Sequence, residues 1–328
     1  MHTFLISRTD SIGDVILTLP LCGIIKENHP DARVLFLCSS YTKPVVELSR
    51  HVNKVLVWDQ LKDLPSNELR ALVRQEGITE LIHVFPRKDL AKAFYKAGLK
   101  NQTGTSHRLY HWLYCNRLVR FSRKKSDLHE TELNCKLLKH IDIDGPRKEM
   151  WHYYGFTNVP PLPERFKALL NNTKQKVIVH PKSKGSAREW GISKYAELIA
   201  LLHSTGQYSI YVSGTAAEKS MLGDLFSEIG NKATDITGQM GLSEFISFIN
   251  GCDALVAAST GPLHIASALG KKAIGIYPSI KPMHAGRWRP IGPQAQAIFV
   301  DKDCNDCLKA QRVLVYSPLW HKKCLRRW

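Results

Sequence analysis

Apolar and polar residues alternate along the chain in blocks that predict strands followed by helices. The apolar segment Thr3–Ser7 predicts a strand, a polar turn follows, and helical spacing from Val15 to about Asn28 predicts a helix. Further strands are predicted at Val34–Cys38, Val55–Val57 and Leu81–Phe85, with helices at Tyr41–Ser49 and Glu68–Gln75. Strands that alternate with helices in this way are typical of a doubly wound parallel sheet.

A proline-rich segment, Val159–Pro163, separates this series from a second one, as connections between domains commonly do. The second series predicts strand Val177–His180, helix Ile192–His203, strand Ser209–Val212, helix Ala217–Glu228, helix Leu242–Asn250, strand Asp253–Ala257, helix Gly261–Leu269 and strand Ala273–Tyr277. The length of 328 residues also agrees with two domains. We therefore expect two α/β domains, residues 1–160 and 161–311, with helices on both faces of each sheet.

Composition and charge narrow the class of protein and its partners. Hydrophobic residues make up 44% and charged residues 23%, which is typical of a globular protein. The 46 Lys and Arg residues exceed the 29 Asp and Glu residues by 17, which favours a phosphate-rich small molecule, a membrane surface or a nucleic acid as partner. No apolar run is long enough to span a bilayer and no signal-peptide pattern is present, so we expect a cytoplasmic protein. Eight scattered cysteines predict thiols that are mostly reduced and structural.

Asp14 is the first candidate for chemistry. It follows Gly13 at the start of the first predicted helix, at the carboxyl edge of the first strand, where doubly wound sheets bind ligands. A carboxylate at this place can remove a proton from a hydroxyl nucleophile. The same position also suits an acidic side chain that merely stabilises a helix N-terminus, and Asp10 shares this ambiguity, so both interpretations stay open.

A basic loop follows the first strand of the second series. Residues 180–190 (HPKSKGSAREW) place Lys182, Lys184 and Arg188 beside Ser183 and directly before a helix. Cations, Ser hydroxyls and a helix N-terminus all stabilise phosphoryl oxygens, and together they can neutralise a departing diphosphate without a metal ion. A solvated basic loop is the alternative interpretation.

Residues 258–270 (ASTGPLHIASALG) are the most specific segment. Ser259, Thr260 and Gly261 offer hydroxyl and backbone N–H donors at a predicted helix N-terminus, which indicates a second phosphate contact. His264 lies about one turn inside this helix and points either into the cleft or into the core. The glycine-rich motifs of dinucleotide-binding proteins and P-loop NTPases are absent, as is the G-x-S-x-G motif of hydrolases.

Together these segments resemble the family 9 glycosyltransferases, the ADP-heptose:lipopolysaccharide heptosyltransferases, over nearly the whole chain. The matching pieces are residues 8–20 (RTDSIGDVILTLP), 180–190 and 259–270, with weaker matches at 237–242 and 287–290. The resemblance implies a GT-B architecture, in which two Rossmann-like domains face a cleft. It further implies that the N-terminal domain holds the acceptor, that the C-terminal domain holds the nucleotide-sugar, and that inverting transfer needs no metal ion or other cofactor.

The resemblance also implies roles for individual residues. By similarity, Asp14 is the general base on the acceptor hydroxyl, and Arg188 stands where the family has a phosphate-binding Lys. The implied substrate-binding set consists of Gly13, Lys182, Ser183, Lys184, Glu218 near the ribose, Met240 near the adenosine, Ser259, Thr260, Gly261 and His264. Ser259 replaces an Asp of well-known members and Gly191 replaces a Pro, so the donor sugar stays open.

Two further segments carry open interpretations. Residues 107–114 (HRLYHWLY) and the basic residues after them, Arg117, Arg120, Arg123, Lys124 and Lys125, fit anionic lipid headgroups or a phosphorylated acceptor, and equally a solvated helix. No nucleic-acid motif accompanies them. Near the end of the chain, Cys304, Cys307, His321 and Cys324 are compatible with zinc, with free thiols or with a local disulfide. Residues 312–328 are expected to form a helix that returns to the first domain.

The sequence thus predicts an inverting, metal-independent glycosyltransferase that moves a heptose or related sugar from ADP-heptose to a lipopolysaccharide inner-core acceptor. We expect it to work in the cytoplasm, at the inner face of the membrane. Two alternatives stay open: a GT-B transferase for another nucleotide-sugar, and a non-enzymatic basic adaptor that binds anionic lipid or nucleic acid.

Overall fold

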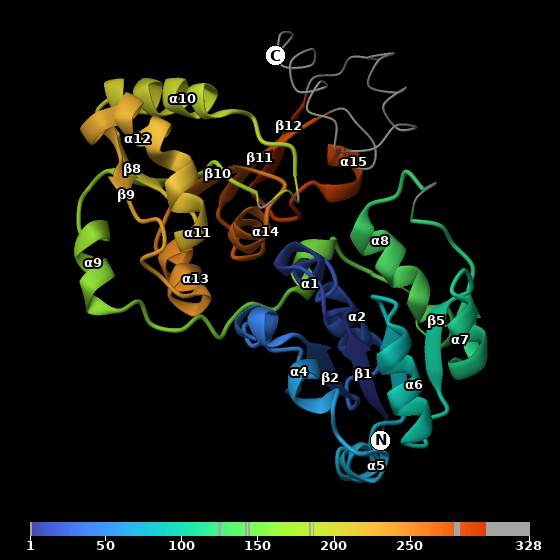
Figure 1. The fold of residues 1–328 in the computed structure, drawn as a ribbon. Coiled ribbons are helices and arrows are strands. Elements are labelled where there is room, and N and C mark those ends of the chain that lie inside the picture. The colour runs from blue at the N-terminus through green and yellow to red at the C-terminus, as the bar shows by residue number, and fades with distance from the viewer. Residues whose placement is uncertain are drawn as a thin grey trace.

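The computed structural model describes residues 2–299, apart from 124–125, 142, 144, 184, 186 and 279–282. Two parallel six-stranded sheets form its framework (Figure 1), with the strand orders β3-β2-β1-β4-β5-β6 and β12-β11-β10-β7-β8-β9. Because β7 to β12 repeat the arrangement of β1 to β6, both sheets have the strand order of the Rossmann fold. The expected α/β fold, with two doubly wound sheets in the GT-B manner, is confirmed.

The first sheet is buried between two layers of helices. Its strands are β1 (Thr3–Ser7), β2 (Arg33–Cys38), β3 (Lys54–Val57), β4 (Glu80–His83), β5 (Gln102–Thr105) and β6 (Arg117–Val119). The helices of this part are α1 (Ile12–Ile16), α2 (Pro20–Asn28), η1 (Ser40–Thr42), α3 (Lys43–Val46), α4 (Trp58–Leu61), α5 (Ser66–Gln75), α6 (Lys88–Lys96) and α7 (Leu109–Tyr114). All five residues of β1 are buried, as is usual for a central parallel strand that helices cover on both faces.

The second sheet repeats this plan. Its strands are β7 (Gln175–His180), β8 (Tyr208–Val212), β9 (Thr234–Asp235), β10 (Ala254–Ala258), β11 (Lys272–Tyr277) and β12 (Ala295–Phe299). The connecting part contains α8 (Glu130–Cys135), η2 (Lys136–His140) and η3 (Met150–Tyr153). The remaining helices are α9 (Glu164–Leu170), α10 (Ile192–Ser204), α11 (Ala216–Lys219), η4 (Ser220–Leu222), α12 (Gly223–Ile229), η5 (Gly230–Lys232), α13 (Leu242–Asn250), α14 (Gly261–Ala268) and α15 (Ala285–Trp288).

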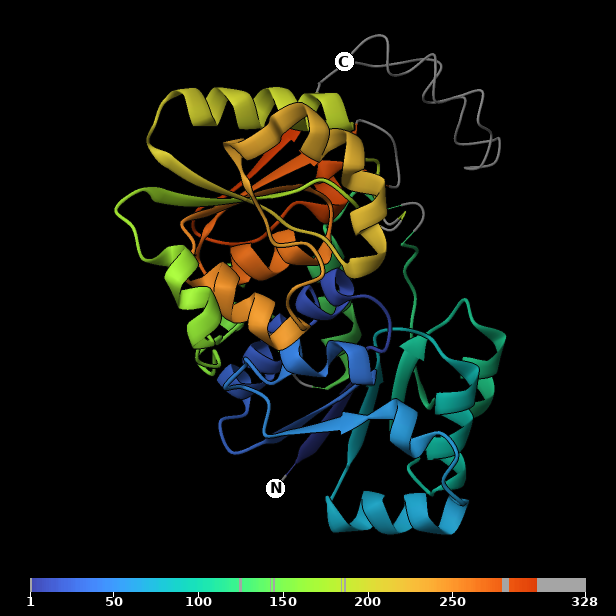
Figure 2. The ribbon, with the colours of Figure 1, turned by 60° about the vertical axis from the view of Figure 1, so that its left-hand side comes forward.

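The two halves meet through α1 and α14, which pack against each other. Figure 2 shows α1, in dark blue, between the two sheets. One buried apolar cluster continues through this contact, from Ile12 and Val15 of α1 to Leu263 of α14. The proline-rich residues 159–163 form neither helix nor strand, and a domain boundary at residue 160 stays a prediction.

Three predicted helices are wrong in their extent. The helix from Val15 to Asn28 is two helices, α1 and α2, because Pro20 has no N–H to continue the first and instead begins the second. The helix Tyr41–Ser49 shortens to η1 and α3, which begins next to Pro44. The helix Ala217–Glu228 is divided into α11, η4 and α12, and α12 starts at Gly223, a residue that weakens helix interiors.

None of the helices in the described ranges combines the length and apolar character that crossing a membrane requires. The expected helix at 312–328 lies outside the described residues.

Candidate active site

A cavity of about 490 Å³, here called the first cavity, opens at the carboxyl ends of the second sheet and against α1. Loops that follow neighbouring parallel strands diverge at this edge and leave room for a ligand. Nine of the twelve predicted site residues line it: Gly13, Asp14, Ser183, Glu218, Met240, Ser259, Thr260, Gly261 and His264. The structure therefore brings residues from five separate segments of the chain to one cavity.

A second cavity of about 400 Å³ lies at the carboxyl ends of β4 and β5 in the first domain. Its lining is strongly charged: Arg8, Arg108, Arg123, Arg287 and His107 stand beside the carboxylates of Asp10, Asp14 and Glu130. Asp14 and Trp288 line both cavities, so the two spaces meet at these two side chains.

Asp14 is held firmly at this junction. Its Oδ1 accepts a hydrogen bond from the Arg8 guanidinium and its Oδ2 accepts one from the Ser11 hydroxyl. The side chain is 19% exposed, which leaves room for a reacting group. Ser11 is the N-cap residue of α1, yet its hydroxyl donates to Asp14 and makes no hydrogen bond that caps the helix. The carboxylate is thus both an acidic residue in the first helical turn and a group that faces two cavities.

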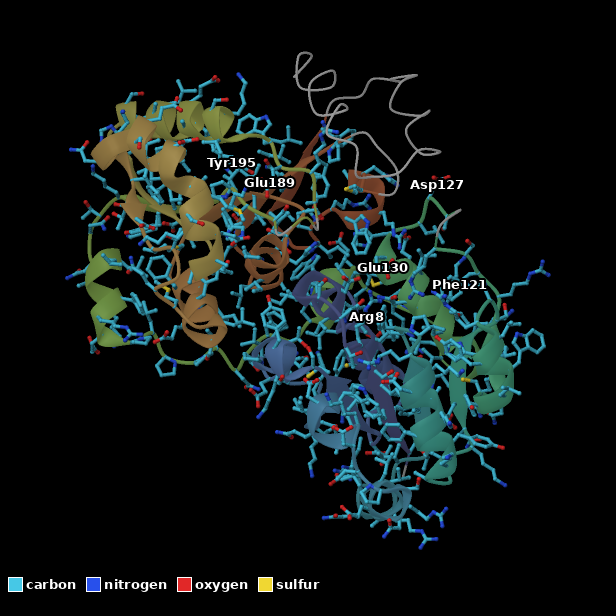
Figure 3. All side chains as sticks on the ribbon, in the orientation of Figure 1. Arg8, Phe121, Asp127, Glu130, Glu189 and Tyr195 are labelled. Carbon is cyan, nitrogen blue, oxygen red and sulfur yellow. The ribbon has the colours of Figure 1, made fainter. Side chains whose placement is uncertain are left out.

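A cluster of ion pairs surrounds Asp14. Arg8 is buried, and besides Asp14 it contacts Asp10 at 2.7 Å and Glu130 at 3.2 Å. Figure 3 shows Arg8 and Glu130 close together beneath α15 and beside α1 and α8. Burial raises the pKa of Asp10 to about 6 in spite of the neighbouring Arg8 guanidinium. Sequence reasoning missed Glu130, because its partner Arg8 is 122 residues away in the chain.

Glu130 joins the two domains. Its carboxylate also contacts Arg123 at 2.9 Å and Arg287, on α15 of the second domain, at 3.0 Å. Burial favours the neutral acid, but the surrounding guanidiniums outweigh it and lower the pKa of Glu130. Beside this cluster, Nε2 of His129 lies 2.9 Å from the backbone oxygen of Arg289, which is a second polar link between the domains.

Two glycines allow the domains to approach closely. A Cβ atom on Gly13 would lie 2.9 Å from Cδ2 of His264, and a Cβ atom on Gly261 would lie 2.9 Å from Cβ of Ile12. Carbon atoms do not pack at such distances, so each domain supplies one glycine to the contact of α1 with α14. The Gly residues of both sequence motifs therefore have a structural role at the junction.

His264 and Thr260 carry polar atoms for which the described part of the chain offers no hydrogen-bond partner. Nδ1 of His264 and Oγ1 of Thr260 are buried and make no hydrogen bond within the described residues. Burial lowers the pKa of His264 to about 3, so its ring is neutral at neutral pH. Thr260 is the N-cap residue of α14, where backbone N–H groups and the helix dipole favour an anion. Unpartnered polar atoms at such a place are suited to a ligand.

Part of the positive charge of the basic loop, residues 180–190, is neutralised by a carboxylate of the same loop. Lys182 pairs with Glu189 at 2.5 Å, and the backbone N–H and hydroxyl of Ser183 donate to the same carboxylate at 2.9 and 3.1 Å. Arg188 is half-buried and lines neither cavity, while Lys184 lies outside the described residues. The phosphate-binding roles of Lys182, Lys184 and Arg188 therefore stay predictions.

Glu218 and Met240 both line the first cavity. Oε2 of Glu218 accepts hydrogen bonds from the backbone N–H and hydroxyl of Thr215, at 2.8 and 2.9 Å, which accounts for its burial at the start of α11. Its contact with a ribose stays a prediction. Met240 is half-buried and belongs to an apolar wall that also contains Ile236, Leu242 and Phe245. Such a wall suits a flat aromatic ring.

Two residues at the cavity carry little or no sequence signal. Tyr41 of η1 is 56% exposed and brings the first domain to the rim of the first cavity, but no motif singled it out. Trp288 lies in the weakly matching segment 287–290, and only the structure shows it between the two cavities.

The cysteine predictions have two outcomes. Cys304, Cys307, His321 and Cys324 lie outside the described residues, as do Lys124 and Lys125. In the described ranges, no group of three or more His, Cys, Asp or Glu side chains is arranged to hold a metal ion. The expectation of free thiols is confirmed for five cysteines: Cys22, Cys38, Cys115, Cys135 and Cys252.

Comparison with known proteins supplies the family. The model of glycosyltransferase family 9 (heptosyltransferase) matches residues 90–316. A Haemophilus influenzae protein named as a glycosyltransferase is 25% identical over 305 residues, which cover 89% of this chain and 86% of that protein. The lipopolysaccharide core heptosyltransferase OpsX of the same species is 22% identical over 299 residues, covering 85% and 79%.

Solved structures agree on the fold. A family 9 glycosyltransferase from Veillonella parvula has a TM-score of 0.78 at 17% identity, covering 97% of this chain and 92% of its own. Escherichia coli heptosyltransferase WaaC with ADP has a TM-score of 0.69 at 17% identity, covering 94% and 98%. With two Rossmann-like sheets, a cavity at the family's motifs and a family match over more than half its length, the chain belongs to glycosyltransferase family 9 and is a heptosyltransferase-like enzyme.

Proposed function

We propose that this enzyme transfers a heptose or related sugar from an ADP-linked donor to the inner core of lipopolysaccharide, with inversion at the anomeric carbon. In this proposal the first cavity holds the donor and the second cavity holds the acceptor. The observation that carries the proposal is that Asp14 lines both cavities. A carboxylate at their junction can take the proton of an acceptor hydroxyl while that oxygen attacks a sugar presented from the other side.

The donor cavity also suits a leaving diphosphate. The N-terminus of α14, the unpartnered Thr260 hydroxyl and the neutral ring of His264 are directed at the same space. A nucleoside diphosphate leaves readily once its charge is stabilised, so a second, protonated carboxylic acid is not required. We include in the proposal that these donors act without a resident metal ion.

Two observations support ADP as the nucleotide and an anionic acceptor. The apolar wall around Met240 and Phe245 is suited to a purine ring, and a structural relative was solved with ADP. The exposed Arg108 at the second cavity provides positive charge for a phosphorylated or carboxylated sugar, and a relative is named for the lipopolysaccharide core.

We further propose that the enzyme works in the cytoplasm, peripheral to the inner face of the membrane. Five free thiols favour a reducing compartment, and the excess of 17 positive charges favours an anionic surface. Membership of an enzyme family argues against the alternative of a non-enzymatic adaptor.

The experiment compares Asp14→Asn with Asp10→Asn, since both carboxylates contact Arg8 but only Asp14 lines the first cavity. Asp14→Asn should lower turnover by about 10² to 10⁴-fold, the usual contribution of a general base, and leave the Kd for ADP unchanged. Asp10→Asn should retain most of the turnover.

Calorimetric titration with ADP, UDP and GDP tests the donor in the same samples. Selective ADP binding supports the proposal, whereas preference for UDP or GDP would assign another donor. Normal turnover in Asp14→Asn, or no binding of any nucleotide, would overturn it.

A further inference from the structure

Helix α7 carries an apolar stripe on its solvent-exposed face, where helices of globular domains usually carry polar residues. Leu109, Trp112 and Leu113 are 86%, 64% and 67% exposed, and their i, i+3, i+4 spacing places them on one face. The other face is fixed by the buried His111, whose Nδ1 lies 2.9 Å from the backbone oxygen of Thr105. The helix is therefore anchored to the domain with its apolar residues directed outward.

The exposed side chains form one ordered surface. Nε1 of Trp112 donates to the backbone oxygen of Ser106 at 2.8 Å, which holds the indole in place although most of it is exposed. Tyr95 of α6 is 47% exposed, and its ring centre lies 5.6 Å from that of Tyr114 on α7. We call Tyr95, Leu109, Trp112 and Leu113 the α7 patch. Figures 1 and 2 both show α7 at the outer edge of the first domain.

The chain around the α7 patch is strongly basic. Residues 85–123 contain nine Lys and Arg residues and one acidic residue, Asp89. Arg87 pairs with Asp89, Arg117 with Glu80 and Arg123 with Glu130, and the other six cations lie outside these ion pairs. Lys88, Lys92 and Lys96 are exposed at i, i+4 and i+8 on α6, the helix that packs against α7. Apolar and aromatic residues surrounded by Lys and Arg match the boundary of an anionic bilayer, where Trp lies at the level of the headgroups and cations bind lipid phosphates.

We propose that the α7 patch docks this enzyme onto an anionic lipid bilayer, with Leu109, Trp112 and Leu113 inserted at the headgroup boundary. His107 and Arg108 directly precede α7 and line the second cavity, so docking brings that cavity to the lipid surface. A lipid-anchored acceptor then reaches Asp14 without leaving the bilayer. The docking itself depends on neither the nucleotide nor the sugar proposed above.

Co-sedimentation with vesicles tests the docking. The wild type should bind vesicles of phosphatidylcholine with 30% phosphatidylglycerol, bind pure phosphatidylcholine weakly, and dissociate as salt rises. Leu113→Ser should lower the partition coefficient by about tenfold, the loss expected when a Leu side chain no longer leaves water. The matched control is Leu201→Ser on α10 of the second domain, since Leu201 is 68% exposed and should leave binding unchanged.

Tryptophan quenching by brominated acyl chains gives a second readout. The brominated vesicles should quench the wild type, and Trp112→Phe should lose that part of the quenching. Equal partition of Leu113→Ser and the wild type would overturn the proposal. So would a dimer in sedimentation without lipid that Leu113→Ser dissociates, because a second copy then covers the patch.

A loss of thermal stability in Leu113→Ser without lipid would show that residues outside the described ranges cover the patch, and would also overturn the proposal. The Kd for ADP of Leu113→Ser should equal that of the wild type. Failure of the docking is therefore distinguishable from failure of the proposed transfer reaction.

Discussion

Replacing Glu130 by Gln tests whether the buried ion pairs at the junction hold the two domains together. The Glu130 side chain is 1% exposed and contacts Arg8, Arg123 and Arg287 at 3.2, 2.9 and 3.0 Å. Gln keeps the shape of Glu but removes its negative charge, and its NH₂ group is a further donor among guanidinium donors. The substitution therefore leaves buried positive charge without compensation.

The structure indicates the size of the effect. Removing one partner of a buried ion pair commonly costs about 3–5 kcal/mol of unfolding free energy. Arg8 retains Asp10 and Asp14 as partners, so it is Arg123 and Arg287 that lose their neutralising carboxylate. We therefore expect the free energy of unfolding to fall by about 3 kcal/mol, the lower end of that range. The guanidiniums lower the pKa of Glu130, so its contribution is present above the unfolded pKa near 4.5 and disappears as pH falls through the folded value.

Urea unfolding at pH 7.5 and at pH 4 measures this loss. The control is Glu47→Gln, because Glu47 is 51% exposed and lies 3.5 Å from Lys43 on the surface, where the pair contributes less than about 1 kcal/mol. The difference between Glu130→Gln and the wild type should shrink at the lower pH. If Glu130→Gln is as stable as Glu47→Gln at pH 7.5, the assignment of Glu130 as the link between the domains is wrong.

Three further predictions concern the junction and the core. Gly13→Ala places a Cβ atom 2.9 Å from His264 and should cost about 1–3 kcal/mol in urea unfolding, whereas Gly223→Ala, which meets no atom within 4 Å, should be neutral or slightly stabilising. Thr260→Val should weaken ADP binding about three- to tenfold in calorimetry without changing the unfolding midpoint; an unchanged Kd would remove Thr260 from the phosphate site. Burial lowers the pKa values of His83 and His264 to about 3, whereas both rings take up a proton near pH 6.5 in the unfolded chain. The free energy of unfolding should therefore be highest above pH 6.5 and fall by about 1.4 kcal/mol per ring for each pH unit below it. Unfolding midpoints that stay constant from pH 6.5 to 5 would contradict this.

The apolar pattern predicted the fold well where strands are apolar and helices are uninterrupted. Strand β1 and helix α13 have the predicted bounds. Strand β5 was not predicted, because its residues Gln102–Thr105 (QTGT) are polar although all four are buried. Nε2 of Gln102 donates to the backbone oxygen of Leu99 at 2.9 Å, and its Oε1 lies 2.7 Å from Nε2 of His83. Such partners exist only after folding, so a periodicity of apolar residues cannot reveal this strand.

Local sequence motifs predicted part of the candidate site. Residues whose role depends on contacts with distant parts of the chain were missed. Gly13, Thr260 and His264 belong to recognisable segments, and the structure brings these segments together. Glu130 had no motif, because its significance depends on guanidiniums from distant parts of the chain. Gly191, at the position where the resemblance implies a Pro, has a φ of +110°, a value that the proline ring forbids, so a Pro cannot adopt this backbone before α10.

The anomeric configuration of the product tests the central claim most directly. If Asp14 activates an acceptor in the second cavity while the donor lies in the first, the acceptor oxygen attacks opposite the diphosphate and the new glycosidic bond has the inverted configuration. Proton NMR of the purified product, made from an ADP-linked heptose and a lipopolysaccharide core acceptor, reads this configuration from the coupling and carbon–proton constants of the anomeric centre. Inversion is the predicted result. Retention of the donor configuration would contradict a single base at the junction of two opposed cavities.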